Sequence, residues 1–246
     1  MITLPKTKSK PTTDAGNVTM LLYGAPKIGK STFCSRFEEA LFIATEPGLN
    51  FLETFNVRVN TWIEFQETLN ALEKGSNFKT LVIDTVDNLW LFCVSEILRQ
   101  YKIQFIGDLS FGKGYALVEA EFQRAINRLV ALGKGLVFIS HAYLDDVDTM
   151  QGKVKKFLPT IPEKARKYIL PLVDIIGFAT AEFSIDAGGN RIERRIIRTQ
   201  PGTLWEAGDR TGRLPDPIPF KFAVFKRYFE GTPTTPSQPQ QAIQEG

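Results

Sequence analysis

The sequence predicts an α/β protein whose mainly parallel sheet is covered by helices on both faces. Short apolar runs at residues 20–23, 40–44, 79–85 and 136–141 alternate with segments of helical spacing. A glycine-containing loop follows the first run and leads directly into a helical segment. After residue 141 the alternation gives way to two strand-like segments joined by a short turn, which predicts a C-terminal β-hairpin extension.

The composition is that of an ordinary globular protein, with 43% hydrophobic and 23% charged residues among 246. The net charge of +3 excludes an overall polycation, so any affinity for nucleic acid must come from a local patch. Cys34 and Cys93 form no C-x-x-C pair, which favours a reduced, intracellular compartment. We expect a cytoplasmic protein without membrane contact, because no apolar run reaches the roughly 18 residues that a membrane helix needs.

The sequence divides into a globular domain over 17–230 and two polar ends. Residues 1–16 carry three lysines among prolines and hydroxyl residues and are predicted to form a flexible basic arm. The arm has no following apolar segment, so it is not a signal peptide. Residues 231–246 are rich in Pro, Thr and Gln, which predicts a disordered tail.

The loop after the first strand has the spacing G-x-x-x-x-G-K-[ST] and precedes a helix predicted over 32–40. Its glycines let successive N–H groups point at an anion, and the N-terminus of the helix adds its dipole. Lys30 is predicted to reach the β- and γ-phosphates of a nucleotide, and the Ser31 hydroxyl to ligate Mg²⁺. The predicted phosphate-binding residues are Gly24, Ala25, Pro26, Lys27, Ile28, Gly29, Lys30, Ser31 and Thr32.

The second strand, 40–44, is followed by Glu46, which should lie near the γ-phosphate at the carboxyl edge of the sheet. Glu46 is therefore our candidate for activating the attacking water, and Asp87 is the reserve. The alternative for Glu46 is a surface carboxylate in a Glu-Pro-Gly turn. A helix is predicted next over 61–74, where Thr61 and Glu64 form a capping box.

The third strand, 79–85, ends in Asp84 after the apolar half of a Walker B element. A carboxylate there faces the phosphate loop and can hold Mg²⁺ directly or through a water. The alternative is an aspartate that caps the helix predicted over 86–101. Many P-loop ATPases place a glutamate directly after the Walker B aspartate, but here that position is Thr85.

The fourth strand ends in His141, the only histidine of the chain. It follows a glycine-containing loop over 103–114 and a helix predicted over 115–132. His141 either senses the γ-phosphate or is a hydrogen-bonded structural residue, and the sequence leaves both readings open. With one histidine and two distant cysteines, the chain offers no zinc site.

The C-terminal third is less periodic. Residues 142–160 are predicted to be a polar loop, 162–169 a helix, 174–186 and 191–199 the hairpin strands around a turn at 187–190, 200–215 a loop, and 220–229 a last helix.

Basic residues gather in two places, in the hairpin and in the region after His141. Each group is either a solvated face or a groove that follows a phosphate backbone. Our predicted DNA-binding residues are Lys153, Lys155, Lys156, Lys164, Arg166 and Lys167. Arg210 and Arg213 are candidates for an arginine finger that reaches the nucleotide of a neighbouring subunit.

Taken together, these motifs resemble a RecA-core ATPase. More narrowly, the chain is similar to phage nucleotide-binding proteins of the AAA-type domain family that act as single-strand annealing or RecA-like recombination proteins. The resemblance covers roughly residues 17–220 and rests on YGAPKIGKST, FIATEPG, TLVIDTVDNL, the FGKGY loop, LVFISH and AGDRTGRLP.

The resemblance implies a RecA-like ATPase domain over 17–230 that binds ATP and Mg²⁺ and hydrolyses ATP with stimulation by DNA. It implies Glu46 as the water-activating residue, Asp84 for the metal and His141 at the sensor position, where RecA has a glutamine. The implied partners are single-stranded DNA, further copies of the chain in a ring or filament, and a single-strand binding protein, in the host cytoplasm if the chain is phage-encoded.

A different class of function fits the same motifs. The chain can be a P-loop switch or motor that acts on a protein partner, in virion assembly or replication loading. The modest net charge and the few aromatic residues within 142–160 support that alternative, because stacking platforms for bases need aromatic side chains. A small-molecule kinase is a third reading, against which the AGDRTGRLP loop argues.

Overall fold

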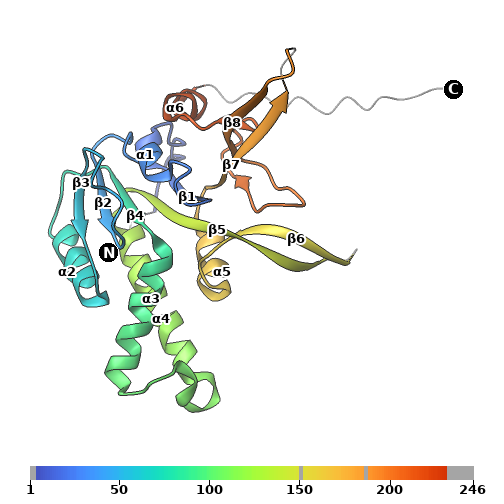
Figure 1. Ribbon diagram of the computed structural model, residues 1–246. Coiled ribbons are helices and arrows are strands. Elements are labelled where there is room, and N and C mark those ends of the chain that lie inside the picture. Colours follow the sequence, from blue (N-terminus) through green and yellow to red (C-terminus); the bar gives the residue numbers. More distant parts are fainter. Residues whose placement is uncertain (1–3, 150–151, 186–187, 232–246) are drawn as a thin grey trace.

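A computed structural model of the protein describes residues 4–149, 152–185 and 188–231. The strands pair in the order β10-β8-β7-β1-β5-β4-β2-β3, and β6 and β9 pair with β5 and β7 respectively (Figure 1). The strands are β1 (Thr19–Gly24), β2 (Ala40–Ala44), β3 (Phe55–Arg58), β4 (Thr80–Asp84), β5 (Gly135–Thr149), β6 (Gly152–Pro159), β7 (Ile175–Ile185), β8 (Arg191–Arg198), β9 (Gly208–Asp209) and β10 (Ile218–Pro219).

The centre of the sheet is parallel, as predicted. β1 pairs in parallel with β5 and β7, and β4 pairs in parallel with β5 and β2. Every residue of β2 and β4 is buried, because helices cover both faces of these strands. The predicted class, an α/β fold whose mainly parallel central sheet is flanked by helices, is confirmed, and β7 and β8 form the predicted C-terminal hairpin. Antiparallel β8 and β10 extend the sheet on the β7 side.

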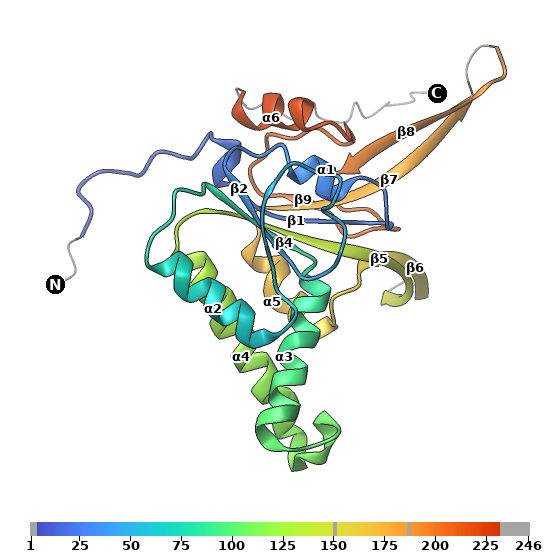
Figure 2. The same cartoon turned by 60° about the vertical axis from the view of Figure 1, so that its left-hand side comes forward.

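Helices cover the two faces unequally (Figure 2). One face packs against α2 (Trp62–Glu73), α3 (Val86–Tyr101), α4 (Lys113–Ala131) and α5 (Glu163–Leu172). The other face packs against α1 (Lys30–Cys34) and α6 (Phe222–Glu230), where Phe33 and Phe225 join the core. Half of the predicted capping box is present: the Thr61 hydroxyl accepts a hydrogen bond from the Glu64 amide at 3.2 Å, but the Glu64 carboxylate accepts from the Asn60 amide at 2.6 Å.

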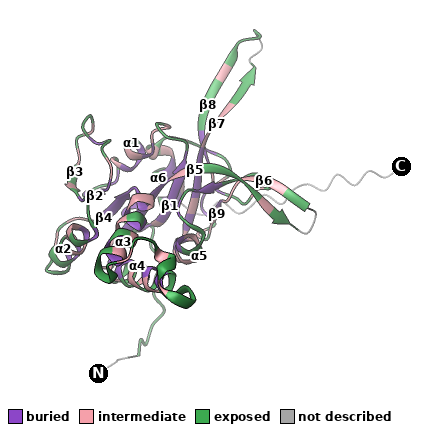
Figure 3. Ribbon diagram, turned by 60° about the horizontal axis from the view of Figure 1, so that its bottom comes forward, coloured by how far each residue is buried: buried purple, intermediate pink, exposed green. Residues whose placement is uncertain are grey.

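The prediction of a polar loop over 142–160 is wrong. β5 continues without a break from the buried sheet to Thr149, and β6 pairs with it in antiparallel register back to Pro159. The two strands form a hairpin that we call the β5–β6 arm. β7 and β8 likewise run beyond the sheet as the β7–β8 arm, and both arms are mainly exposed (Figure 3).

Smaller differences concern element length. The helix predicted over 32–40 ends at Cys34, and β3, which forms one edge of the sheet, has no counterpart in the prediction. The loop over 103–114 contains two short 3-10 turns, and α5 runs to Leu172, beyond its predicted end. Residues 4–14 form no helix or strand, whereas 232–246 of the predicted tail lie outside the described residues. Among the described residues, every helix is too short or too polar to cross a bilayer.

Candidate nucleotide site

The predicted phosphate loop joins the carboxyl end of β1 to the N-terminus of α1. Gly24 is required by packing, because a Cβ at this position would lie 2.3 Å from the carbonyl oxygen of Ala179 on β7. Gly29 is required by its backbone, since its φ of 110° is in the left-handed region that favours glycine. The two glycines therefore hold the loop in a shape that leaves the amides at the start of α1 available to an anion.

Lys30 is folded back over the loop in the structure. Its Nζ donates hydrogen bonds to the carbonyl oxygens of Gly24 at 2.9 Å and Ala25 at 3.0 Å. Burial lowers the pKa of Lys30, and the nearby carboxylate of Asp84 opposes that shift. A bound phosphate would offset the burial cost more fully than two carbonyl groups do.

Ser31 and Asp84 meet at the position predicted for the metal. The Ser31 hydroxyl donates to Asp84 Oδ2 at 2.7 Å, and burial raises the pKa of Asp84. Both groups are hard oxygen ligands, and Mg²⁺ takes few protein ligands beside phosphate oxygens and waters. Ser31 and Asp84 therefore fit a nucleotide-bound Mg²⁺.

Glu46 and His141 lie beside each other at the carboxyl ends of β2 and β5. His141 Nε2 is 3.4 Å from Glu46 Oε1, and Asn88 Nδ2 donates to Glu46 Oε2 at 3.3 Å. The Glu46 side chain keeps 32% of its surface exposed, so it is open to a water in the cavity. The structure also places a bend at this Glu-Pro-Gly segment, so the catalytic role of Glu46 stays a prediction.

Asp87, the reserve base, is engaged elsewhere. Its carboxylate accepts hydrogen bonds from the Ser140 hydroxyl at 2.7 Å and from the His141 amide at 2.9 Å. Burial raises its pKa, whereas these two hydrogen bonds oppose the shift. Asp87 therefore ties the N-terminal turn of α3 to β5 at the point where the strand leaves the sheet.

One cavity of about 680 Å³ brings together the predicted catalytic residues and most of the predicted phosphate-binding residues, but Gly24, Ala25 and Ile28 are not part of its lining. Its lining includes Lys30, Ser31, Glu46, Asp84 and His141. The remaining lining residues are Pro26, Lys27, Gly29, Thr32, Pro47, Gly48, Phe51, Leu52 and Thr85. The volume is in the usual range for a small-molecule site.

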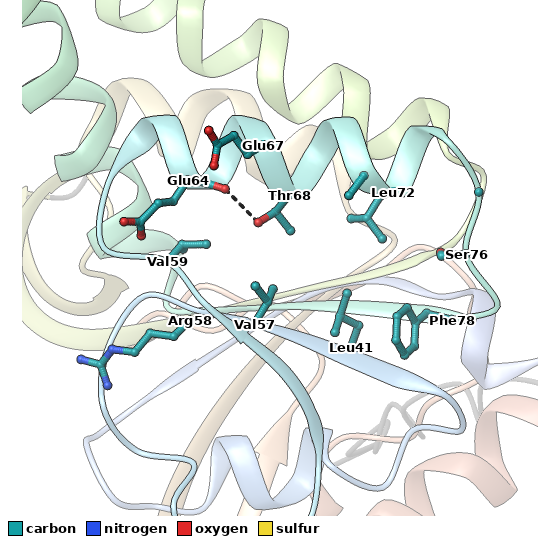
Figure 4. Close-up of a pocket in the computed structure, with 12 residues that line it drawn as sticks. Leu41, Val57, Arg58, Val59, Glu64, Glu67, Thr68, Leu72, Ser76 and Phe78 are labelled. Carbon is teal, nitrogen blue, oxygen red and sulfur yellow. Dashed lines mark hydrogen bonds between the residues drawn. The ribbon is translucent and has the colours of Figure 1, made fainter.

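A second cavity, of about 640 Å³, lies between α2 and the edge of the sheet (Figure 4). Leu41, Val57 and Phe78 point into it from the strand side, and the Thr68 hydroxyl donates to the Glu64 carbonyl at 2.8 Å on the helix side. This lining contains no phosphate-binding loop, so the similar volume does not indicate a nucleotide site.

The six predicted DNA-binding residues do not form one unpaired patch. Lys156 pairs with Glu206 at 2.7 Å, Lys164 with Glu119, and Lys167 with Glu163 at 2.6 Å. Arg166 donates to the Pro159 carbonyl and the Tyr143 hydroxyl. Lys153 and Lys155 lie exposed on β6, opposite Asp148 and Asp146 of β5.

The two candidate finger arginines have partners within their own chain. Arg213 is only 9% exposed and donates to the Phe229 carbonyl at 2.5 Å, so a role as a trans finger would require this side chain to leave its present contacts. Arg210 is exposed and donates to the Pro171 carbonyl at 2.6 Å. Its role in a neighbouring subunit stays a prediction.

Two residues that the sequence did not single out connect the site to distant segments. The buried Tyr23, one residue before Gly24, donates to the carbonyls of Glu206 at 2.7 Å and Phe157 at 3.1 Å. Arg195 of β8 donates to the Ile28 carbonyl in the phosphate loop at 3.1 Å. Such contacts join residues more than 130 positions apart, so no local pattern could have predicted them.

The fold and the cavity define a P-loop nucleotide-binding protein, and comparison with known proteins gives its family. Residues 16–211 match the AAA domain family, so the chain belongs to that family. It is also 27% identical over 160 residues to the SPbeta prophage-derived uncharacterized protein YorG of Bacillus subtilis (strain 168). The match covers 62% of this chain and 46% of YorG, so the chain spans about half the length of that relative.

Among solved structures, the flagellar accessory protein FlaH of Methanocaldococcus jannaschii is similar with a TM-score of 0.39 and 12% identity. The alignment covers 74% of this chain and 77% of FlaH.

Proposed function

We propose that the protein is a Mg²⁺-dependent ATPase whose nucleotide state controls the β5–β6 arm, and that it acts on single-stranded DNA in annealing or RecA-like pairing. One observation carries the proposal. β5 runs from the nucleotide cavity, where His141 lies 3.4 Å from Glu46, straight into the exposed arm. A change at the γ-phosphate can therefore reach the arm along a single strand.

The residues of the cavity support hydrolysis of the terminal phosphate. The loop amides and Lys30 hold the phosphates, and Glu46 takes a proton from the attacking water. The water oxygen forms a bond to the γ-phosphorus while the bond from that phosphorus to the bridging oxygen breaks, which yields ADP and phosphate. Ser31 and Asp84 would hold Mg²⁺, which when bound would neutralise charge on the phosphates.

The DNA half of the proposal rests on the two arms. Lys153 and Lys155 of β6 and Arg191 and Arg194 of β8 are exposed on them. Phe183 on β7 is 53% exposed and lies against the Arg191 guanidinium at 3.8 Å, a pairing of cation and aromatic ring suited to bases and phosphates.

A second candidate function is a switch that acts on a protein partner. The observation that favours it is the charge balance of the β5–β6 arm, where Asp145, Asp146 and Asp148 face Lys156, Lys155 and Lys153 across the strands. A nearly neutral surface with charges of both signs should bind a polyanion less strongly than a polar protein surface of complementary charge.

The test combines ATP hydrolysis with DNA affinity. Binding of a fluorescent oligo-dT strand is measured with ATP, with ADP and without nucleotide over a salt series, and Lys30→Ala is the control. We expect hydrolysis by the wild type, none by the control, and at least about fivefold tighter DNA binding with ATP. DNA binding that is absent or independent of salt in every state would remove the DNA half in favour of a protein partner. Absent hydrolysis would remove the ATPase itself.

A further inference from the structure

Thr85 occupies the position after Asp84, where the sequence lacks the glutamate of many P-loop ATPases. It is 1% exposed and lines the same cavity as Glu46 and His141. Its hydroxyl oxygen has no hydrogen-bond partner among the described residues. A buried hydroxyl without a partner costs stability, so its presence here calls for a physical reason.

The amide and the carbonyl group of Thr85 both form hydrogen bonds with one neighbouring residue, Thr45. The Thr45 hydroxyl accepts a hydrogen bond from the Thr85 amide at 2.8 Å and donates to the Thr85 carbonyl, also at 2.8 Å. This clamp joins β2 and β4 directly beside Glu46 and Asp84. Thr85 is thus held in place through its main chain, and its side chain takes no part in that clamp.

The helix that follows does not use the hydroxyl either. Thr85 is the N-cap residue of α3, and a threonine at this position commonly accepts a hydrogen bond from an amide of the first turn. No such bond is present here. Capping and strand clamping, the two ordinary structural uses of this hydroxyl, are therefore both excluded.

We infer that the Thr85 hydroxyl positions the water that attacks the γ-phosphate. This inference rests on the proposed ATPase function. The water donates one hydrogen to Glu46 and the other to Thr85 Oγ1, which leaves a lone pair directed at phosphorus. Glu46 is the base, and Thr85 shares the water with it.

The decisive variants are Thr85→Val, which keeps the branched shape and removes the hydroxyl, and Thr85→Ser, which keeps the hydroxyl. For Thr85→Val we expect hydrolysis to fall at least about thirtyfold, within the range of lost positioning contacts. We expect the affinity for a non-hydrolysable ATP analogue to change less than about twofold, because bound substrate does not need the water. Binding of ADP–aluminium fluoride, which mimics the attacked phosphate, should weaken by a factor similar to the loss in rate. Thr85→Ser should restore most of the rate.

Thermal stability separates this role from a structural one. Thr85→Val removes an unpaired buried polar atom and should leave the melting temperature unchanged or higher. The matched control is Thr45→Val at a neighbouring buried threonine, which loses both clamp hydrogen bonds and should melt at a lower temperature. The inference would be overturned if Thr85→Val melts at a lower temperature than the wild type and loses as much affinity for the ATP analogue as for ADP–aluminium fluoride. Thr85 would then have a structural role.

Two further outcomes are distinguishable. If the wild type hydrolyses ATP and Thr85→Val does so at the same rate, the inference is wrong and the ATPase proposal stands. If the wild type does not hydrolyse ATP at all, the proposed function is wrong and the role of Thr85 falls with it.

Discussion

Both arms leave the sheet at the carboxyl ends of its parallel strands, but they differ in charge and in their contacts with the nucleotide site. On the β5–β6 arm, three aspartates face three lysines across the strands. On the β7–β8 arm, β8 carries four arginines, whereas Glu182 and Glu193 are the acidic residues within the described parts of its strands. A run of lysines in the sequence therefore does not by itself indicate a positively charged surface. A hairpin can place acidic residues from elsewhere in the sequence opposite the lysines, and the charges then cancel.

The two arms also contact the nucleotide site at different places. The root of the β5–β6 arm contacts the nucleotide site through Asp87 and Tyr23. The β7–β8 arm borders the phosphate loop instead, because β7 pairs with β1 as far as Gly24 and Arg195 donates to the Ile28 carbonyl. His141, at the root of the β5–β6 arm, lies 3.4 Å from Glu46, the candidate base. We therefore expect the β5–β6 arm to respond to nucleotide and the β7–β8 arm to supply more of the attraction for a polyanion.

The largest expected effect tests the response to nucleotide. Glu46→Gln should bind ATP normally but hydrolyse it about 10²- to 10⁴-fold more slowly, because the amide cannot take a proton. With ATP held in place, amide hydrogen exchange should slow in the β5–β6 arm and change little in the β7–β8 arm. Single-turnover hydrolysis and exchange read by mass spectrometry measure both effects.

Two outcomes would contradict this prediction. Normal hydrolysis by Glu46→Gln would move the base elsewhere, with Asp87 as the first suspect. Equal protection of both arms would show that nucleotide does not distinguish them.

The next effect concerns DNA. Replacing Arg191 and Arg194 together with alanine should weaken oligo-dT binding about tenfold at low salt and reduce the salt dependence by about 0.7 for each lost phosphate contact. The matched variant replaces Lys153 and Lys155, which face aspartates across the β5–β6 arm and should matter less. A larger loss from the lysine variant would restore the sequence-based assignment of the DNA site.

A smaller effect concerns the root of the β5–β6 arm. Tyr23→Phe removes the hydroxyl that accepts from the Glu206 amide and donates to two carbonyl groups. Leaving those buried groups unpaired should cost about 1–3 kcal/mol in the free energy of unfolding. Amide exchange should speed up around Phe157 before it does so in β8. Urea denaturation gives the total, and uniform acceleration over both arms would break the proposed difference in attachment.

The sequence predicted the nucleotide half of the molecule well because its signals are local. The spacing from Gly24 to Ser31 and the apolar run before Asp84 fix residue types within a few positions of each other. Parallel pairing then brings the ends of β1, β2, β4 and β5 to one edge. The meeting of Glu46 with His141 follows from that geometry.

The β5–β6 arm was harder to predict than the β7–β8 hairpin, because the contacts that stabilise it are not local. Charged residues that face each other across the strands, such as Asp146 and Lys155, interrupt the alternation of apolar and polar residues that would mark a strand in this segment. The contacts of Tyr23 at its root span 134 and 183 residues. The orphaned hydroxyl of Thr85 is likewise visible only once its neighbours are in place.

The smallest expected effect is the pH dependence of stability, which originates at Asp84 in the nucleotide cavity and at Asp87 beside the root of the β5–β6 arm. Burial raises the pKa of both Asp84 and Asp87 above the ordinary value of 3.8. The folded protein therefore holds these protons more tightly than the unfolded chain does. Their contribution to the free energy of unfolding is greatest at low pH and is lost as pH rises from that ordinary value through the raised pKa.

Asp84→Asn has no proton to lose at this position. Without nucleotide or Mg²⁺, its free energy of unfolding should therefore increase relative to that of the wild type by a fraction of a kcal/mol as pH rises. Urea denaturation at about pH 4.5 and about pH 7.5 measures the difference, which should be larger at the higher pH. A variant less stable than the wild type at the higher pH would mean that the hydrogen bond from Ser31 to the carboxylate outweighs its burial. With Mg²⁺ and ATP the order should reverse, because bound metal favours the charged carboxylate that asparagine cannot supply.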